Sequence, residues 1–193
     1  MVMQNGYSEI MPPKPPKGAK RTSDSYTEQI QLLTQSGING YGRLFGGQLM
    51  QWIDVVAAVV ARRHSGCNVT TAAIDNLQFL GPAYPNDSVL LTGTLTHVGK
   101  TSMEVCVKTY VEHLSGTRKM INTAYVVLVA LDEDERPIEV PPLITETLEE
   151  RLEWEAGERR RALRKQRKKE NYEGKEDGET RYWQSLPFCC LSV

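Results

Sequence analysis

Apolar and polar positions change their spacing near Gly66. Before it, residues 49–61 are apolar almost all the way round a helix, and only Gln51 and Asp54 in that run are polar. After it, apolar residues alternate with polar ones as far as residue 131. A period near 3.6 is typical of helices and a period of two is typical of strands. The pattern therefore predicts one long, enclosed helix followed by an antiparallel meander.

The ends of these elements are marked by turn residues. The expected helix covers residues 46–64, with a glycine pair at its start and basic residues at its end, where they suit the helix dipole. In the third strand, apolar residues alternate with Glu104, Cys106 and Lys108, so one face should be buried and the other exposed. The expected strands cover residues 26–34, 69–80, 88–98, 103–112 and 118–131.

One long helix and a meander predict an α+β domain in which an antiparallel sheet wraps around one central helix. We assign residues 1–23 to a flexible arm rich in proline and lysine, and residues 24–143 to the domain. Residues 144–193 form a charged helical extension and tail, which we expect to be solvated over 145–170. The domain shows no internal repeat, so a second helix-and-sheet unit would have to come from another copy of the chain.

The composition limits the kinds of binding partner that we expect. The 193 residues and 40% hydrophobic content suit one domain, and the net charge of −1 predicts no general attraction to nucleic acid or membranes. The basic tract at 159–169 lacks interleaved aromatic residues, so we interpret it as a solvated helix face. The apolar helix is too short to cross a bilayer. We expect no nucleic acid and no membrane partner.

The four cysteines have neither metal-binding nor disulfide spacing, which predicts a cytoplasmic protein. The first 21 residues have no apolar core, so we expect no secretory signal there. Cys190 stands four residues from the end beside Cys189, but Ser192 and Val193 fit a prenylation signal poorly, so we treat that match as chance.

Asp54 needs an explanation because a carboxylate on an apolar helix is costly to bury without a partner. It could cap a turn or pair with a basic side chain, or it could be a general base or nucleophile in a cleft. Gly46 and Gly47 favour the second interpretation, because their backbone N–H groups stand at the positive end of the helix dipole and could bind an oxyanion. These groups together would suit hydrolysis of an activated ester.

Gly46 and Asp54 are eight positions apart, about 12 Å on one helix, which is too far for both to act on one carbonyl. If both act on one substrate, Asp54 must face the helix start of a partner chain. We therefore predict a two-fold dimer with antiparallel central helices and two shared sites.

Residues 39–54, NGYGRLFGGQLMQWID, resemble the signature N-x-x-G-x-I/L-F-G-G-x-L/I-M-x-x-M/I-D of hot-dog-fold acyl-coenzyme A thioesterases. The resemblance continues through Phe79-x-x-Pro82, Gly99-Lys100-Thr101-Ser102-Met103 and Val140-Pro141. It covers roughly residues 24–143 and leaves both tails outside. It implies the hot-dog fold, hydrolysis of fatty acyl-CoA, no cofactor, and a homodimer or a trimer of dimers.

The resemblance also implies roles for single residues. Asp54 would be the catalytic carboxylate, as base or nucleophile, Asn39 would hold water or substrate, and the Gly46 N–H would bind the thioester oxygen while Gly47 permits close approach. The implied contacts to the nucleotide end of the substrate are Gly99, Lys100, Thr101, Ser102, and Arg62 or Arg63. Against these stand simpler interpretations: Asn39 as a loop residue bonding its own backbone, and Lys100, Arg62 and Arg63 as ordinary turn or helix-end cations.

Two other functions are considered. A non-catalytic acyl-CoA sensor or scaffold of the same fold could use the same groove, although the presence of Asp54 argues against it. A dehydratase would need a histidine beside the helix acid, and His64, His97 and His113 are scattered without such spacing or a metal-ligand pattern. We therefore expect an acyl-CoA thioester hydrolase without a metal.

Overall fold

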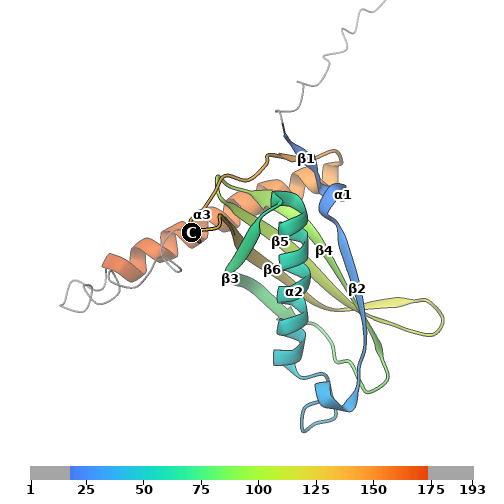
Figure 1. Ribbon diagram of the computed structural model, residues 1–193. Helices are drawn as coiled ribbons and strands as arrows, with labels where there is room; N and C mark the ends of the chain where they lie inside the picture. The colour runs from blue at the N-terminus through green and yellow to red at the C-terminus, as the bar shows by residue number, and fades with distance from the viewer. Residues whose placement is uncertain (1–17, 174–193) are drawn as a thin grey trace, which may run out of the picture.

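The computed structural model describes residues 18–173. Within that range a long helix, α2 (Gly46–Ser65), lies across a curved sheet, as the alternation of periods predicts (Figure 1). The outer parts of the predicted arm and tail, with Cys189 and Cys190, lie outside the described residues.

The sheet has five strands in the order β2-β4-β5-β6-β3, and every neighbouring pair is antiparallel. Their bounds are β2 (Thr27–Leu32), β3 (Asn68–Phe79), β4 (Ser88–Val98), β5 (Ser102–Glu112) and β6 (Arg118–Leu131). These agree with the predicted strands to within two residues at each end. β2 and β3 form the two edges of the sheet. The predicted α+β fold is confirmed.

α2 packs on the inner face of the sheet. Ile53, Ala57 and Val60 are completely buried there. A side chain in place of Gly93 on β4 would come within 2.7 Å of Val56 and 2.8 Å of Val60, so glycine permits the close packing of helix and strand. The helix is capped at Gly66, whose φ is 73° and whose N–H bonds the Arg62 carbonyl.

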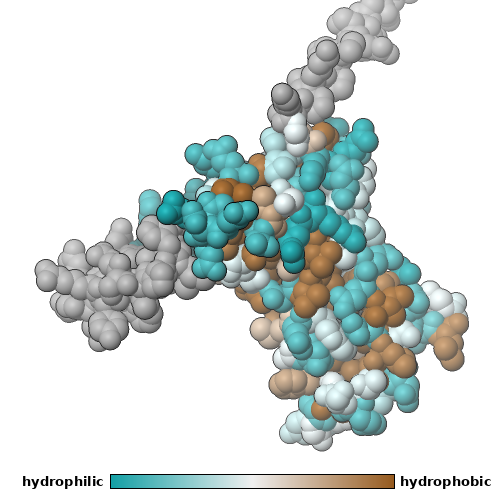
Figure 2. Space-filling model, viewed as in Figure 1, coloured by the Kyte–Doolittle hydropathy of each residue, from teal (hydrophilic) through white to brown (hydrophobic). Residues whose placement is uncertain are grey.

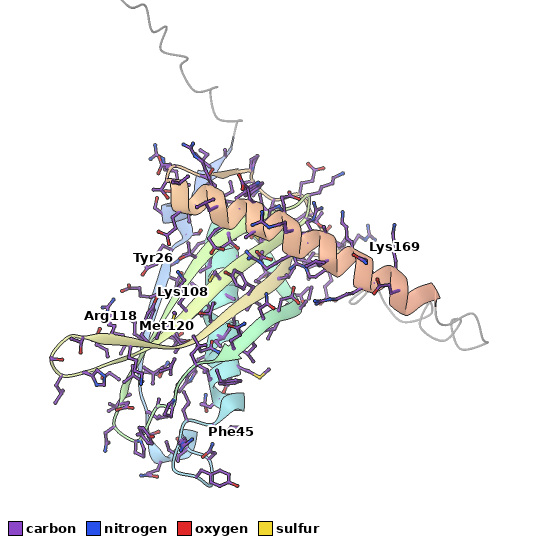
Figure 3. The ribbon with its side chains drawn as sticks, turned by 180° about the vertical axis from the view of Figure 1, so that it is seen from behind. Tyr26, Phe45, Lys108, Arg118, Met120 and Lys169 are labelled. Atoms are coloured by element: carbon purple, nitrogen blue, oxygen red, sulfur yellow. The ribbon has the colours of Figure 1, made fainter. Side chains whose placement is uncertain are left out.

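A second long helix, α3 (Leu148–Glu173), crosses the outer face of the sheet (Figure 3). We expected the extension to be solvated, but the rings of Trp154 and His97 pack at a tilt with centroids 4.5 Å apart, and a side chain at Gly157 would meet His97 at 2.6 Å. The basic second half of α3 reaches past the sheet, where Figure 3 labels Lys169.

This packing also corrects the prediction that β5 has one exposed face. Glu104 and Cys106 belong to the face opposite α2, yet only 1% and 4% of their surfaces are exposed. Arg160 and Arg164 of α3 both bond the Glu104 carboxylate, and Arg164 also bonds Asp75 of β3. At Glu104 and Cys106 the outer face of β5 is therefore covered by α3, whereas Lys108, Tyr110 and Glu112 farther along the same face stay half-exposed.

Short elements complete the fold. β1 (Lys20–Arg21) pairs in parallel with β7 (Leu143–Ile144), and α1 (Thr22–Ser25) and η1 (Gln35–Gly37) precede α2. Regular structure thus begins ahead of the predicted domain start at residue 24. None of the helices in the described part of the chain has the length and apolar character needed to cross a bilayer.

Candidate active site

Asp54 lies in the middle of α2 and is half-buried. The hydroxyl of Thr71, on edge strand β3, donates a hydrogen bond of 2.6 Å to Oδ1 of Asp54. Among the described residues no basic side chain forms an ion pair with this carboxylate, so a structural ion pair within one chain does not explain it. One oxygen is fixed by the threonine, and the other is available to a proton donor such as water.

Thr71 was not among the residues predicted from the sequence. It stands in a run of strand residues, where threonine is common for its shape alone. In the structure, the pairing of β3 with β6 shifts between Thr71 and Ala73. Such irregularities re-aim side chains next to functional sites.

The start of α2 is open. Phe45 precedes the helix without a side-chain cap, and the Leu49 N–H is the first to donate within it, to the Phe45 carbonyl at 3.1 Å. Within residues 18–173, the N–H groups of Gly46, Gly47 and Gln48 have no acceptor, as expected at a helix N-terminus. They can therefore donate to an anionic oxygen.

Two aromatic rings explain why glycines are needed at that point. A side chain at Gly46 would lie 3.3 Å from the Phe79 ring, and one at Gly47 would lie 2.6 Å from the Phe45 ring. Both rings are more than half exposed, and Phe45 projects at the N-terminal end of α2 in Figure 3. The start of α2 therefore has free N–H donors next to two apolar aromatic rings.

One chain does not bring all predicted residues together. Gly46 and Asp54 stand on the same helix, about 12 Å apart along its axis. Asn39 lies in the loop before α2, where its Oδ1 accepts from the backbone N–H groups of Tyr41 at 2.9 Å and Arg43 at 3.2 Å. This is the local interpretation of Asn39 that the sequence had also suggested.

The residues predicted at the nucleotide end fall into two groups. Gly99, Lys100, Thr101 and Ser102 form the β4–β5 turn, closed by a 2.7 Å bond from the Gly99 N–H to the Ser102 carbonyl. Arg63 instead fastens α2 to β2, donating to the Tyr26 carbonyl and the Thr27 hydroxyl. The Arg62 side chain is exposed at the helix end.

His64 and His97 are held by contacts inside the fold. His64 is buried, with Nε2 2.8 Å from the Pro141 carbonyl, and burial lowers the pKa of its imidazole. His97 is buried against Trp154 and bonds Glu158 at 2.7 Å. Within residues 18–173, no group of three or more histidines, cysteines or acids is arranged to hold a metal ion.

A cavity of about 580 Å³ lies on the outer face of the sheet, away from Asp54. Tyr26, Lys108 and Arg118, labelled in Figure 3, line it together with the first turns of α3. It contains none of the predicted site residues.

Comparison with known proteins matches residues 41–116 to the thioesterase superfamily. An uncharacterized acyl-CoA thioester hydrolase of Bacillus subtilis is 41% identical over 132 residues, which cover 68% of this chain and 77% of that protein. An acyl-CoA hydrolase from Staphylococcus aureus, solved with butyryl coenzyme A, coenzyme A and coenzyme A disulfide, is 29% identical with a TM-score of 0.76, covering 81% of this chain and 96% of that one. A hexameric acyl-CoA thioesterase in its apo form is 35% identical with a TM-score of 0.74, covering 77% and 96%.

Other solved structures of the Staphylococcus aureus hydrolase are variants in which an asparagine, an aspartate or a threonine is replaced by alanine. Those positions are separated by 15 and 17 residues in that chain. Asn39, Asp54 and Thr71 have the same two separations in this one.

Proposed function

This chain belongs to the acyl-CoA thioester hydrolase family, whose members have the hot-dog fold, and from that membership we propose that it hydrolyses fatty acyl-CoA thioesters to the free acid and coenzyme A. The observation that supports this most is the Asp54 carboxylate, held by Thr71 at 2.6 Å on an otherwise apolar helix. The shared spacing of Asn39, Asp54 and Thr71 with the variant positions of the Staphylococcus aureus enzyme supports the same assignment.

The proposed reaction uses water. Asp54 accepts a proton from a water molecule whose oxygen attacks the thioester carbonyl carbon. The carbonyl oxygen becomes an oxyanion, which accepts hydrogen bonds from the Gly46 N–H and its neighbours at a helix start. The carbon–sulfur bond then breaks, and the thiolate of coenzyme A takes up a proton. In the alternative mechanism Asp54 is itself the nucleophile and forms an acyl-enzyme anhydride, which water then cleaves. This mechanism would use the same geometry.

The site is proposed to be shared between two subunits, because Asp54 and Gly46 are held about 12 Å apart on one helix. The face that α2 and β3 present supports a dimer there. It carries large apolar side chains that are 39% to 57% exposed, and Figure 2 shows apolar surface on this side. These residues are Phe45, Met50, Val55, Phe79 and Leu80. β3 also has an unpaired edge within the described sheet.

We further propose that such dimers assemble in threes, which would give the hexamer found for the apo acyl-CoA thioesterase. Asn39 would act from the loop beside the helix start, where its Nδ2 donors remain available although Oδ1 bonds the backbone. No cofactor takes part in this scheme.

The test is Asp54→Asn, which keeps the shape and the Thr71 bond but removes the base. We expect kcat for acyl-CoA to fall by about 10²-fold or more, while coenzyme A binding by calorimetry stays within about twofold. The matched control is Asp134→Asn, the same change in an exposed turn, which should leave kcat unaffected.

Two results would count against the proposal. Near-normal thiol release by Asp54→Asn would remove this residue from the mechanism. Tight acyl-CoA binding by the unaltered chain, with no free thiol released over a ladder of acyl lengths, would favour the sensor or scaffold alternative.

A further inference from the structure

Three successive arginines on α3 have different surroundings. Arg160 is largely buried, bonds Glu104 at 2.8 Å and lies over the Tyr125 ring at 3.7 Å. Arg159 is exposed. Arg161 is half-exposed and lies over the β4–β5 turn, where its Nη2 would be 3.2 Å from a Cβ placed on Gly99. Arg161 is therefore positioned against a turn rather than against an acid.

The charge of Arg161 is not neutralised by a contact. Among the described side chains, no carboxylate lies within ion-pair distance of its guanidinium. Its nearest acid on α3, Glu158, is bonded to His97 at 2.7 Å. The hydrogen bond with His97 lowers the pKa of Glu158, and the charges of His97, Arg161 and Lys165 lower it further, so Arg161 and Lys165 both lie near this acid.

The turn beneath Arg161 offers more donors. The backbone N–H groups of Lys100 and Thr101 have no acceptor within residues 18–173. The Ser102 hydroxyl would be 2.8 Å from a Cβ on Gly99, so the space that glycine leaves open is bordered by a hydroxyl and a guanidinium. Lys100 pairs with Glu139 at 3.1 Å, but both side chains are more than 70% exposed and such a pair is readily exchanged.

These groups together offer hydrogen-bond donors and positive charge to an oxyanion. Free backbone N–H groups in a turn, a hydroxyl and a planar guanidinium are the donors that bind phosphate oxygens. Val140 bonds the Lys100 carbonyl, and Pro141 next to it bonds His64 of α2, so the turn lies at the C-terminal end of α2. From Asp54 to that end α2 spans about 16 Å, which an extended pantetheine arm can bridge.

We propose that Arg161 of α3 completes the binding site for a phosphate group of the coenzyme A moiety, together with the Gly99–Ser102 turn. The inference rests on the proposed function, since it assigns the phosphate end of the same substrate. It gives the C-terminal helix, outside the matched thioesterase segment, a direct part in substrate binding. Arg161 acts on binding and not on the bond that breaks.

The test compares Arg161→Gln with Arg159→Gln in the full chain, using three thioesters of one acyl group: acyl-CoA, acyl-dephospho-CoA and acyl-pantetheine. For Arg161→Gln we expect KM for acyl-CoA to rise about tenfold with kcat unchanged. KM for acyl-pantetheine, which lacks the nucleotide and its phosphates, should stay the same. Arg159→Gln should match the unaltered protein with all three.

The dephospho substrate identifies which phosphate is bound. If Arg161→Gln no longer affects KM once the 3′-phosphate is absent, Arg161 binds that group; if the effect persists, it binds the pyrophosphate. Equal KM values for Arg161→Gln and Arg159→Gln with acyl-CoA would overturn the inference. So would an equal rise for acyl-pantetheine, which would indicate a general disturbance of α3.

Binding of coenzyme A by calorimetry separates this inference from the proposed function. We expect a Kd about tenfold weaker for Arg161→Gln than for Arg159→Gln. If no thioester is hydrolysed but that difference is found, the proposed function fails and the binding site stands. If hydrolysis is normal and the difference is absent, the opposite holds.

Discussion

Thr71 limits the Asp54 carboxylate to one orientation. The 2.6 Å bond fixes Oδ1 toward β3 and leaves Oδ2 as the free oxygen. A threonine on a strand is rigid, because its branched side chain has few rotamers. Asp54 is thus oriented by a neighbour that does not itself change charge during the proposed reaction.

Replacing Thr71 by valine keeps the shape and removes the donor. Since a hydrogen bond to a charged group is worth about 1.5–3 kcal/mol, we expect kcat to fall about tenfold or more with little change in KM. Thr71→Ser keeps the hydroxyl and should retain most of the activity. Steady-state kinetics on both variants checks this, and equal kcat values for valine and serine would show that the bond does not orient the base.

Functional residues differ in how clearly the sequence marks them. Asp54 is conspicuous because a lone acid on an apolar helix is costly, and the glycine pair is conspicuous because two glycines rarely start a helix without a reason. Thr71 gives no such signal, since its partner is 17 residues away and its own strand accounts for it. The free guanidinium of Arg161 was equally hidden within a run of basic residues.

At the scale of elements, α3 replaces the expected solvent on the outer face of the sheet. Periodicity identified every long strand, because alternation records which side chains share a face. It does not record what covers each face, and so Glu104 was expected to face water. The acid is instead buried between two arginines of a helix that composition alone marked as solvated.

This buried cluster predicts a dependence of stability on pH. Burial raises the pKa of Glu104, but hydrogen bonds from Arg160 and Arg164 and the charge of Arg160 outweigh it and hold the pKa below its usual range. The stabilisation by Glu104 is therefore fully present above its unfolded pKa and is lost as pH falls through the folded one. At pH 7, Glu104→Gln should lower the free energy of unfolding by about 3–5 kcal/mol.

Urea unfolding at several pH values checks this prediction. The difference between the unaltered chain and Glu104→Gln should shrink as pH falls below about 4.5. Glu112→Gln, which removes the partner of Arg118 at the surface, is the control and should change stability by less than about 1 kcal/mol. A pH-independent difference between the first two proteins would contradict the account.

At the scale of the whole molecule, the proposed shared site makes activity a property of pairs of chains. A chain with Asp54→Asn lacks the base, and a chain with Gly46→Val has a blocked helix start, because the added side chain meets Phe79. In a mixed dimer one site receives both defects and the other receives none. Mixing the two inactive variants should therefore restore activity.

After unfolding and refolding an equal mixture, half the dimers are mixed and each has one intact site, so about a quarter of the normal rate is expected. The separately refolded variants are the controls. A mixture that stays as inactive as its components, although mixed dimers are detected by mass, would show that each chain forms its own site.

Neighbouring residues of β5 contact two unlike interiors: Val105 packs among the apolar residues under α2, and Glu104 lies among the guanidinium groups under α3. A shift of one residue in strand pairing would exchange the faces of these two side chains. The Glu104 carboxylate would then lie in the apolar core, and the two arginines would face a valine. Packing against α2 on one face and α3 on the other therefore fixes the pairing register of β5. A sheet with shifted register would be unfavourable on both faces.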